Sequence, residues 1–281
     1  MNKKLPILRL LRPHQWVKNL FVFAPLVFSG QFLVLISIEF TILAFILFCL
    51  GSSAVYIVND WHDIEADRNH PVKRSSRPLA SGEVSISTAF LLIIILWIPV
   101  LLGFFITPKI AGIICCYTLI NLAYTFWLKN QPVLDIFTIA VGFVLRVYAG
   151  ALAINVPVSN WMFITTLCLA LFLASIKRRQ EILKSGTGGR SVLSKYSVPL
   201  IERYAEISGS GALIFYGLFV MSSKPSLVMT IPFVIFGLFR YWFLVEKNNK
   251  GESPTDALLT DYQLIINIII WVVICVLSLV K

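Results

Sequence analysis

Three aspartates that could bind a metal ion lie within eight residues of one another, next to an asparagine. Asn59, Asp60, Asp63 and Asp67 form the pattern N-D-x-x-D-x-x-x-D. On a continuing helix, spacings of three and four residues place all four side chains on one face. Carboxylates stacked in this way repel one another, and Mg2+, which uses one or two carboxylates together with phosphate oxygens, would compensate their charge. The pattern therefore predicts a Mg2+ site with these four residues as ligands.

Basic residues follow the acids directly. Lys73, Arg74 and Arg77 lie within reach of whatever such a metal would hold, and guanidinium groups bind two phosphate oxygens at once. The sequence thus predicts a metal-bound diphosphate between the acids and the bases. Two alternatives stay open: an acidic helix end that pairs internally with these bases, and a positive loop that only sets the orientation in a membrane. Further candidates for phosphate binding are Lys18, Lys129, Arg146, Lys177, Arg178 and Arg179.

The composition shows which elements must position these groups. Of 281 residues 58% are hydrophobic and only 14% are charged, and the mean hydropathy is +0.83. These values predict an all-α polytopic membrane protein with one helical-bundle domain over residues 1–281. Nine apolar runs approach the length of a membrane-spanning helix: 20–36, 40–58, 88–106, 110–128, 133–154, 160–176, 207–222, 226–245 and 263–280.

The distribution of basic residues predicts how these spans are oriented. Nineteen of the 24 Lys and Arg residues fall on the N-terminus and on the connections that share its side, against three on the other side. The positive-inside rule therefore predicts a cytoplasmic N-terminus, an outer C-terminus and four cytoplasmic loops, at about 59–87, 129–132, 177–206 and 246–262. The net charge of +10 suits anionic lipid headgroups, and no nucleic-acid-binding pattern is present in the sequence. The sequence is compatible with a homo-oligomer but does not require one.

Several separate motifs together resemble one family. The pattern at 59–67 near the end of the second span, followed by R-P-L-A-S-G at 77–82, resembles the UbiA superfamily of intramembrane prenyltransferases. That superfamily has a second Asp-rich motif after the sixth helix, where this chain has S-I-K-R-R-Q-E at 175–181. This departure resembles the decaprenyl-phosphate phosphoribosyltransferase branch, as do R-P-H-Q-W-V-K-N (12–19), H-P-V-K-R (70–74), L-K-N-Q-P-V-L-D (128–135) and G-F-V-L-R-V-Y-A-G-A (142–151).

The resemblance implies an activity. It implies Mg2+-dependent transfer of 5-phosphoribose from phosphoribosyl pyrophosphate to a polyprenyl phosphate at the cytoplasmic face of a bacterial-type inner membrane, as in arabinofuranose-donor synthesis for a cell wall. Asp60, Asp63 and Asp67 would act on the leaving diphosphate, and the bases would bind the remaining phosphates. The lipid phosphate is already anionic at neutral pH, so positioning and electrostatics would carry most of the catalysis.

Charged and aromatic residues farther along the chain admit two interpretations each. Asp135 and Arg146 lie eleven residues apart on one apolar segment and so face the same way. Both could line the site, with Asp135 as a catalytic residue that holds a base or a ribose hydroxyl, or they could form a buried structural pair. Tyr124 and Tyr196 could bind sugar or phosphate, or belong to an interfacial aromatic belt. For the remaining charges, structural roles are favoured: a loop or helix cap for Asp256 and Asp261, and packing near a helix end for Arg240.

Three other functions would require residues at other places in the sequence. An aromatic prenyltransferase of the same superfamily would require acids after the sixth span. An ion-coupled transporter using Asp63, Asp67 and Asp135 would require acids near the bilayer midplane and polar openings on both faces. A phosphatidyltransferase of the CDP-alcohol type would require the string D-G-x-x-A-R, which this sequence lacks.

Overall fold

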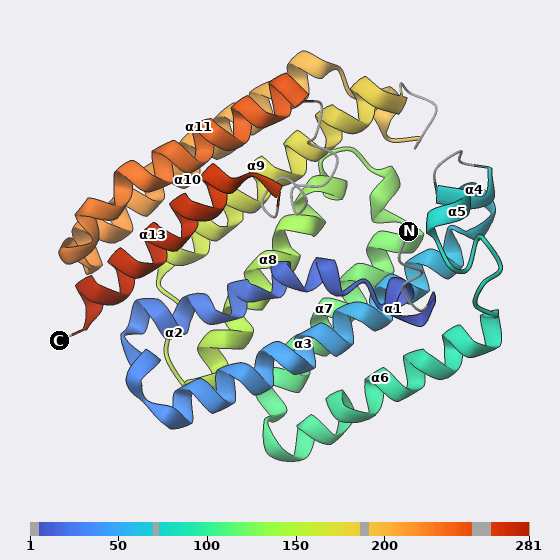
Figure 1. Cartoon of the computed structure of the whole chain (residues 1–281), viewed down its shortest axis with the longest axis horizontal. Helices are drawn as coiled ribbons and strands as arrows, with labels where there is room; N and C mark the ends of the chain where they lie inside the picture. The colour runs from blue at the N-terminus through green and yellow to red at the C-terminus, as the bar shows by residue number, and fades with distance from the viewer. Residues whose placement is uncertain (1–5, 70–72, 186–190, 249–259, 281) are drawn as a thin grey trace.

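The chain folds into one bundle of long helices (Figure 1). The computed structural model describes residues 6–69, 73–185, 191–248 and 260–280, and within these ranges the chain contains helices and no strand. Eight segments are long and apolar enough to cross a membrane. The described part of the chain therefore has the architecture of the predicted multi-pass membrane protein.

Most predicted spans coincide with helices. The first long helix is α3 (Leu35–His62), and the others are α6 (Ile86–Ile106), α7 (Pro108–Phe126), α8 (Leu134–Ala153), α9 (Asn160–Ser185), α10 (Val198–Ser223), α11 (Ile231–Asn248) and α13 (Tyr262–Leu279). Side-chain caps mark the first turn of three of these helices. Ser85, Ser197 and Asp261 each accept a hydrogen bond from a backbone N–H in the first turn of α6, α10 and α13, respectively.

The first predicted span, 20–36, is wrong as a continuous helix. The chain forms α1 (Pro6–Leu11), the 3-10 helix η1 (Pro13–Phe23), α2 (Ala24–Ser29) and the short 3-10 turn η2 (Gln31–Leu33) before α3 begins. Gly30 adopts a left-handed conformation with φ of 79°, which ends α2 and turns the chain back. The eight apolar segments that are long enough to cross a membrane begin with α3. A ninth span would therefore have to be formed by the irregular segment before it.

The predicted connection 177–206 is also wrong in extent. Helix α9 continues nine residues past its predicted end, and α10 begins nine residues before its predicted start. Lys177, Arg178 and Arg179 therefore lie on a helix rather than in a loop. The predicted bounds follow the apolar residues, and both helices continue past them. Lys, Arg and Glu are good helix formers, so a helix can extend beyond its apolar part.

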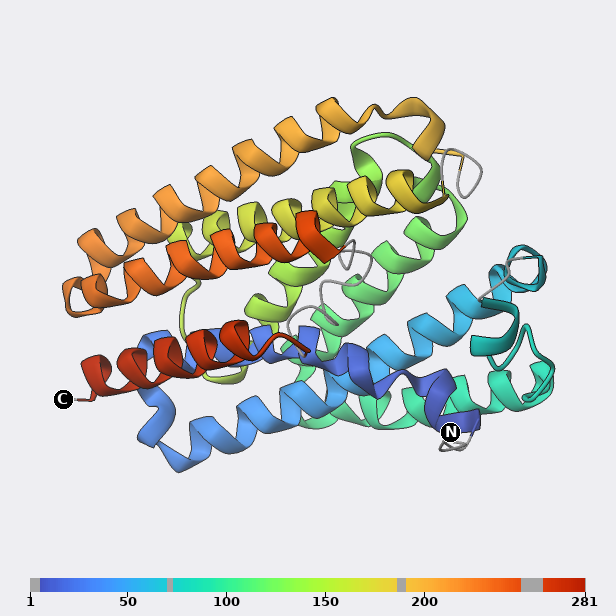
Figure 2. The same ribbon diagram turned by 45° about the horizontal axis from the view of Figure 1, so that its top comes forward.

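Helix α8 lies at the centre of the bundle. It packs against α7 on one side and α9 on another, and η1 lies against it. Helices α3, α6 and α7 form one half of the molecule, while α9, α10, α11 and α13 form the other (Figures 1 and 2). The connection after α3, with the short helices α4 (Ile64–Arg68) and α5 (Lys73–Ser76), lies at the right end in Figure 1.

Candidate active site

The acidic motif lies where α3 ends. Asn59 and Asp60 are in the last turn of α3, Asp63 is the residue after it, and Asp67 is in α4. The helix breaks at Asp63, yet Asp63 N–H donates to the Asn59 carbonyl at 3.0 Å and Asp67 N–H to the Asp63 carbonyl at 2.8 Å. These two bonds keep the helical spacing across the break, so the motif keeps approximately the spacing that the sequence predicts.

Asp60 is the most deeply buried acid of the motif. Its side chain is 1% exposed, and its Oδ1 accepts hydrogen bonds from the guanidinium groups of Arg12 and Arg77. Its Oδ2 is buried and has no hydrogen-bond partner among the described residues. A buried carboxylate oxygen without a partner costs free energy, and a bound cation would satisfy it.

Asp63 and Asp67 pair with other bases. Lys129 Nζ lies 2.7 Å from Asp63 Oδ1, and Asn59 Nδ2 donates to Asp63 Oδ2 at 3.3 Å. Although burial opposes it, the hydrogen bonds from Lys129 and His62 lower the pKa of Asp63, so this acid is ionised at neutral pH. Burial raises the pKa of Asp67, and the nearby Asp63 charge adds to this effect, despite Lys73 Nζ at 3.5 Å from Asp67 Oδ1.

The acids do not form a complete metal site by themselves. In the described part of the chain, no three His, Cys, Asp or Glu residues come together as metal ligands. A Mg2+ ion needs only one or two carboxylates when a substrate supplies phosphate oxygens. The free Oδ2 of Asp60 and the oxygen donors of this helix end fit that mode of binding, in which the ion arrives with its phosphate ligand.

Asp135 lies in a second cluster, and its side chain is fully buried. Its Oδ2 accepts a hydrogen bond from Arg178 Nε at 2.6 Å, and its Oδ1 accepts one from the Tyr196 hydroxyl at 2.7 Å. Arg178 is 0% exposed and also donates to Tyr124 Oη at 2.8 Å and to Glu181. Burial and the bond to Asp135 raise the pKa of Tyr196. The cluster joins α7, α8, α9 and the connection before α10, so Tyr124 and Tyr196 have hydrogen-bond partners inside the protein.

Of the two interpretations of Asp135 and Arg146, the buried structural pair is wrong. Arg146 is 3% exposed, and its guanidinium donates to Asn19 Oδ1 at 2.8 Å, the Gly142 carbonyl at 2.8 Å and Tyr117 Oη at 3.1 Å. These hydrogen-bond partners are uncharged, and the guanidinium carbon also lies near the rings of Phe48, Tyr117 and Phe143. Asp135 and Arg146 share a face of α8, but Asp135 forms its ion pair with Arg178 from α9.

The remaining predicted phosphate ligands lie on several different elements. Arg179 pairs with Glu202 and Glu246, each at 2.7 Å, and Lys177 lies 4.0 Å from Glu181. Arg74 lines a separate hollow of about 670 Å³ together with Arg68. Lys18 lies on η1 and is half-buried. Among the predicted bases, Lys73, Arg77 and Lys129 contact the acidic motif with their charged groups.

The structure adds residues that the sequence interpretation left out. Arg12 contacts Asp60 directly, and Glu181 contacts Arg178. Arg12 begins the string R-P-H-Q-W-V-K-N that carries part of the family resemblance, so a signal for it was present. Asp261 does cap α13, as expected, and also pairs with Arg240 at 2.7 Å, whereas Asp256 lies outside the described residues.

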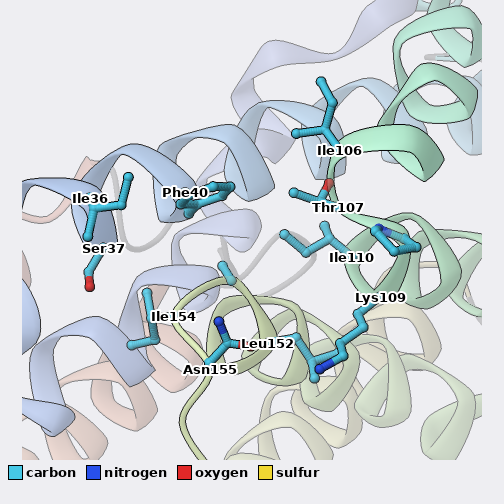
Figure 3. A pocket seen from close by; sticks show the side chains of 12 residues that line it. Ile36, Ser37, Phe40, Ile106, Thr107, Lys109, Ile110, Leu152, Ile154 and Asn155 are labelled. Carbon is cyan, nitrogen blue, oxygen red and sulfur yellow. The ribbon is translucent and has the colours of Figure 1, made fainter.

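A second hollow, of about 360 Å³, lies at the other end of the bundle. It is lined by residues of the first turns of α3, the α6–α7 turn and the end of α8 (Figure 3). Its polar side chains are Ser37, Thr107, Lys109 and Asn155. It contains no acid, so it does not share the chemistry of the α3 end.

Comparisons with known proteins agree on one family. The profile described as the UbiA prenyltransferase family matches residues 22–259. The decaprenyl-phosphate phosphoribosyltransferase of Mycolicibacterium smegmatis is 33% identical over 95% of this chain and 90% of its own length. The protein of the same name from Corynebacterium glutamicum is 32% identical over 95% of this chain and 84% of its own.

Solved structures agree on the fold. A UbiA homologue from Archaeoglobus fulgidus bound to GPP and Mg2+ superposes with a TM-score of 0.74. The match covers 98% of this chain and 99% of the homologue at 21% sequence identity. At that identity the likeness shows a shared helical bundle.

Proposed function

Since the chain belongs to the UbiA prenyltransferase family and is a membrane-embedded transferase, we propose that it transfers 5-phosphoribose from phosphoribosyl pyrophosphate to a polyprenyl phosphate. The names of the bacterial relatives support this donor and this class of acceptor. One observation carries the proposal: the acids at the end of α3 are surrounded by bases from separate elements, namely Arg12, Lys73, Arg77 and Lys129. That arrangement suits a highly charged diphosphate.

The reaction exchanges one C–O bond for another. The bond between ribose C1 and the diphosphate oxygen breaks, and its electron pair leaves with the diphosphate. A lone pair on an oxygen of the lipid phosphate forms the new bond to C1. The attacking oxygen is already anionic, so the protein's task is to hold both reactants in line and to stabilise the leaving charge.

The acids and bases at the α3 end would share this task. Mg2+, held by Asp60, Asp63 and Asp67 with Asn59 as a ligand or orienting group, would neutralise charge on the leaving diphosphate. Arg77, Lys73 and Lys129 would exchange part of their contacts with these acids for phosphate oxygens. Arg74, Lys177 and Arg179 remain candidates for the 5-phosphate or the lipid phosphate. Arg178, Tyr124 and Tyr196 act through the buried cluster around Asp135.

The C-terminal part of α9 favours this reaction over aromatic prenylation. An acidic cluster would be expected in this part of the chain for a prenyl-diphosphate enzyme, but α9 carries Lys177, Arg178 and Arg179 there. Arg178 is bound to Asp135 in the interior, and Arg179 is bound to Glu202 and Glu246. We propose that this end lies at the inner face of a bacterial-type plasma membrane, because the positive-inside rule predicts cytoplasmic loops where the basic residues gather.

Transfer of label to lipid tests the proposal. Membranes that contain the protein, incubated with Mg2+, radiolabelled phosphoribosyl pyrophosphate and a polyprenyl phosphate, are expected to place label in the lipid phase. Removal of divalent metal with EDTA should reduce this labelling by about 100-fold or more, and added Mg2+ should restore it. Membranes without the protein are the control. No lipid label with acceptors of several lengths, combined with transfer from a prenyl diphosphate to an aromatic acid, would sink the proposal.

A further inference from the structure

The N-terminal segment brings a base to the acids from outside the acidic motif. Arg12 precedes η1, which lies between α3 and α8, and donates to buried Asp60. Its backbone has φ of 53° and ψ of 56°, a left-handed conformation that non-glycine residues seldom adopt. Such a conformation persists where surrounding contacts hold it, and it is enriched at functional sites.

Contacts with α3 hold the start of this segment. Ser53 Oγ donates to the Leu11 carbonyl at 2.9 Å and accepts from Trp16 Nε1 at 3.0 Å. The Arg12 guanidinium carbon lies 5.2 Å from the centre of the Tyr56 ring. Ser53, Tyr56 and Asp60 lie on one side of α3, so the direction of the Arg12 side chain is fixed along its length.

A buried polar cluster holds the middle of the segment. Asn19 is 1% exposed and donates to Ser52 Oγ and Cys49 Sγ, both at 3.2 Å, while its Oδ1 accepts from Arg146 Nε. Arg146 thereby links η1 to α8 and α7. Burying the Arg146 cation among neutral hydrogen-bond partners costs free energy. This cost indicates that the hydrogen bonds of Arg146 have a function in the protein.

Close backbone contact completes the attachment. A Cβ atom at Gly150 of α8 would lie 1.9 Å from the carbonyl oxygen of Val22, at the end of η1. Only glycine allows the two backbones to approach this closely. The segment is therefore held near its start by Ser53 of α3, in its middle by the hydrogen bonds of Asn19, and at its end by the contact of Val22 with Gly150.

We propose that Arg12 is a further substrate-binding residue, whose guanidinium contacts the diphosphate of the donor, and that Arg146 is a positioning residue that holds Arg12 in place through Asn19. The assignment rests on the proposed function for the identity of the donor. A guanidinium has five N–H donors, so Arg12 can keep one bond to Asp60 while others bind phosphate oxygens. Arg146 is thus a structural contributor to the site rather than a phosphate ligand.

Binding of inorganic diphosphate with Mg2+ to the purified full-length protein tests both assignments without requiring turnover. Arg12→Ala should raise the dissociation constant by about 10- to 100-fold, because a hydrogen bond to a charged group is lost. Arg12→Lys should recover part of the affinity. Arg146→Lys should weaken binding about tenfold in the wild-type background and have little effect in the Arg12→Ala background, since its contribution passes through Arg12.

A pair of glycine variants supplies the matched control. Gly150→Ala should weaken diphosphate binding, whereas Gly217→Ala on α10, where an added Cβ meets no atom within 4 Å, should leave it unchanged. Wild-type affinity in Arg12→Ala overturns the Arg12 assignment, and additive effects of Arg12→Ala and Arg146→Lys overturn the positioning role. Normal diphosphate binding with the expected variant effects, but no phosphoribosyl transfer, overturns the proposed function and leaves Arg12 assigned. A wild-type protein that binds no diphosphate overturns both.

Discussion

Asp63→Asn is expected to lower the rate of phosphoribosyl transfer by about 100-fold or more in a protein that still folds. Asp63 is ionised at neutral pH, because the hydrogen bonds from Lys129 and His62 outweigh burial and lower its pKa. The asparagine has nearly the same shape and can still accept from Lys129, so the helix end is retained. It lacks the charge with which the carboxylate would hold Mg2+ and the diphosphate. The measurement is lipid labelling by purified protein at saturating substrate.

Glu65→Gln is the matched control for this variant. Glu65 is exposed and only two residues away, and the helical spacing of the motif excludes it from the acidic face. The same change of carboxylate to amide should leave transfer within about twofold of the wild type, because isolated surface substitutions have small effects. Full activity in Asp63→Asn would remove the metal-site interpretation of the motif. An equal loss in both variants would point to net charge of the loop instead.

The sequence predicts those parts of the fold that depend on local pattern. The apolar runs at 88–106, 110–128 and 133–154 match α6, α7 and α8 to within two residues at each end. A run of that length must be helical in a membrane, since every backbone group has to bond within the segment. The acidic motif is likewise local, and its spacing survives the break at Asp63.

Contacts between distant segments could not be predicted in the same way. Arg146 and Asp135 share a helix face, so the sequence is compatible with a pair between them. In the structure, Arg178 of α9 binds Asp135 instead. The close approach of Val22 to Gly150 likewise joins residues more than 100 positions apart in the chain. The contact of Arg12 with Asp60 could not be predicted for this reason, although Arg12 belongs to one of the motifs that carry the family resemblance.

Asp135→Asn is expected to destabilise the protein by about 1–3 kcal/mol, because the buried Arg178 guanidinium loses one of its two carboxylate partners and keeps only Glu181. Both side chains are 0% exposed, and their bond is 2.6 Å long. A second change, Arg178→Met in the same protein, should restore part of the lost stability, since replacing a whole buried pair is often nearly neutral. The thermal unfolding midpoint in detergent, with all variants compared under one condition, provides the measurement.

Glu202→Gln gives the comparison that separates a buried pair from a partly exposed one. Glu202 is 32% exposed, and its partner Arg179 also binds Glu246, so this change should cost at most about 1 kcal/mol. If Asp135→Asn instead unfolds at the wild-type temperature and has lost transfer activity, Asp135 is a catalytic residue. If it has lost stability and Arg178→Met recovers both stability and residual transfer, the Asp135 cluster acts by holding α8 and α9 together behind the acidic motif. The charge in the interior then serves the geometry of the site, while the charge at the end of α3 serves the chemistry.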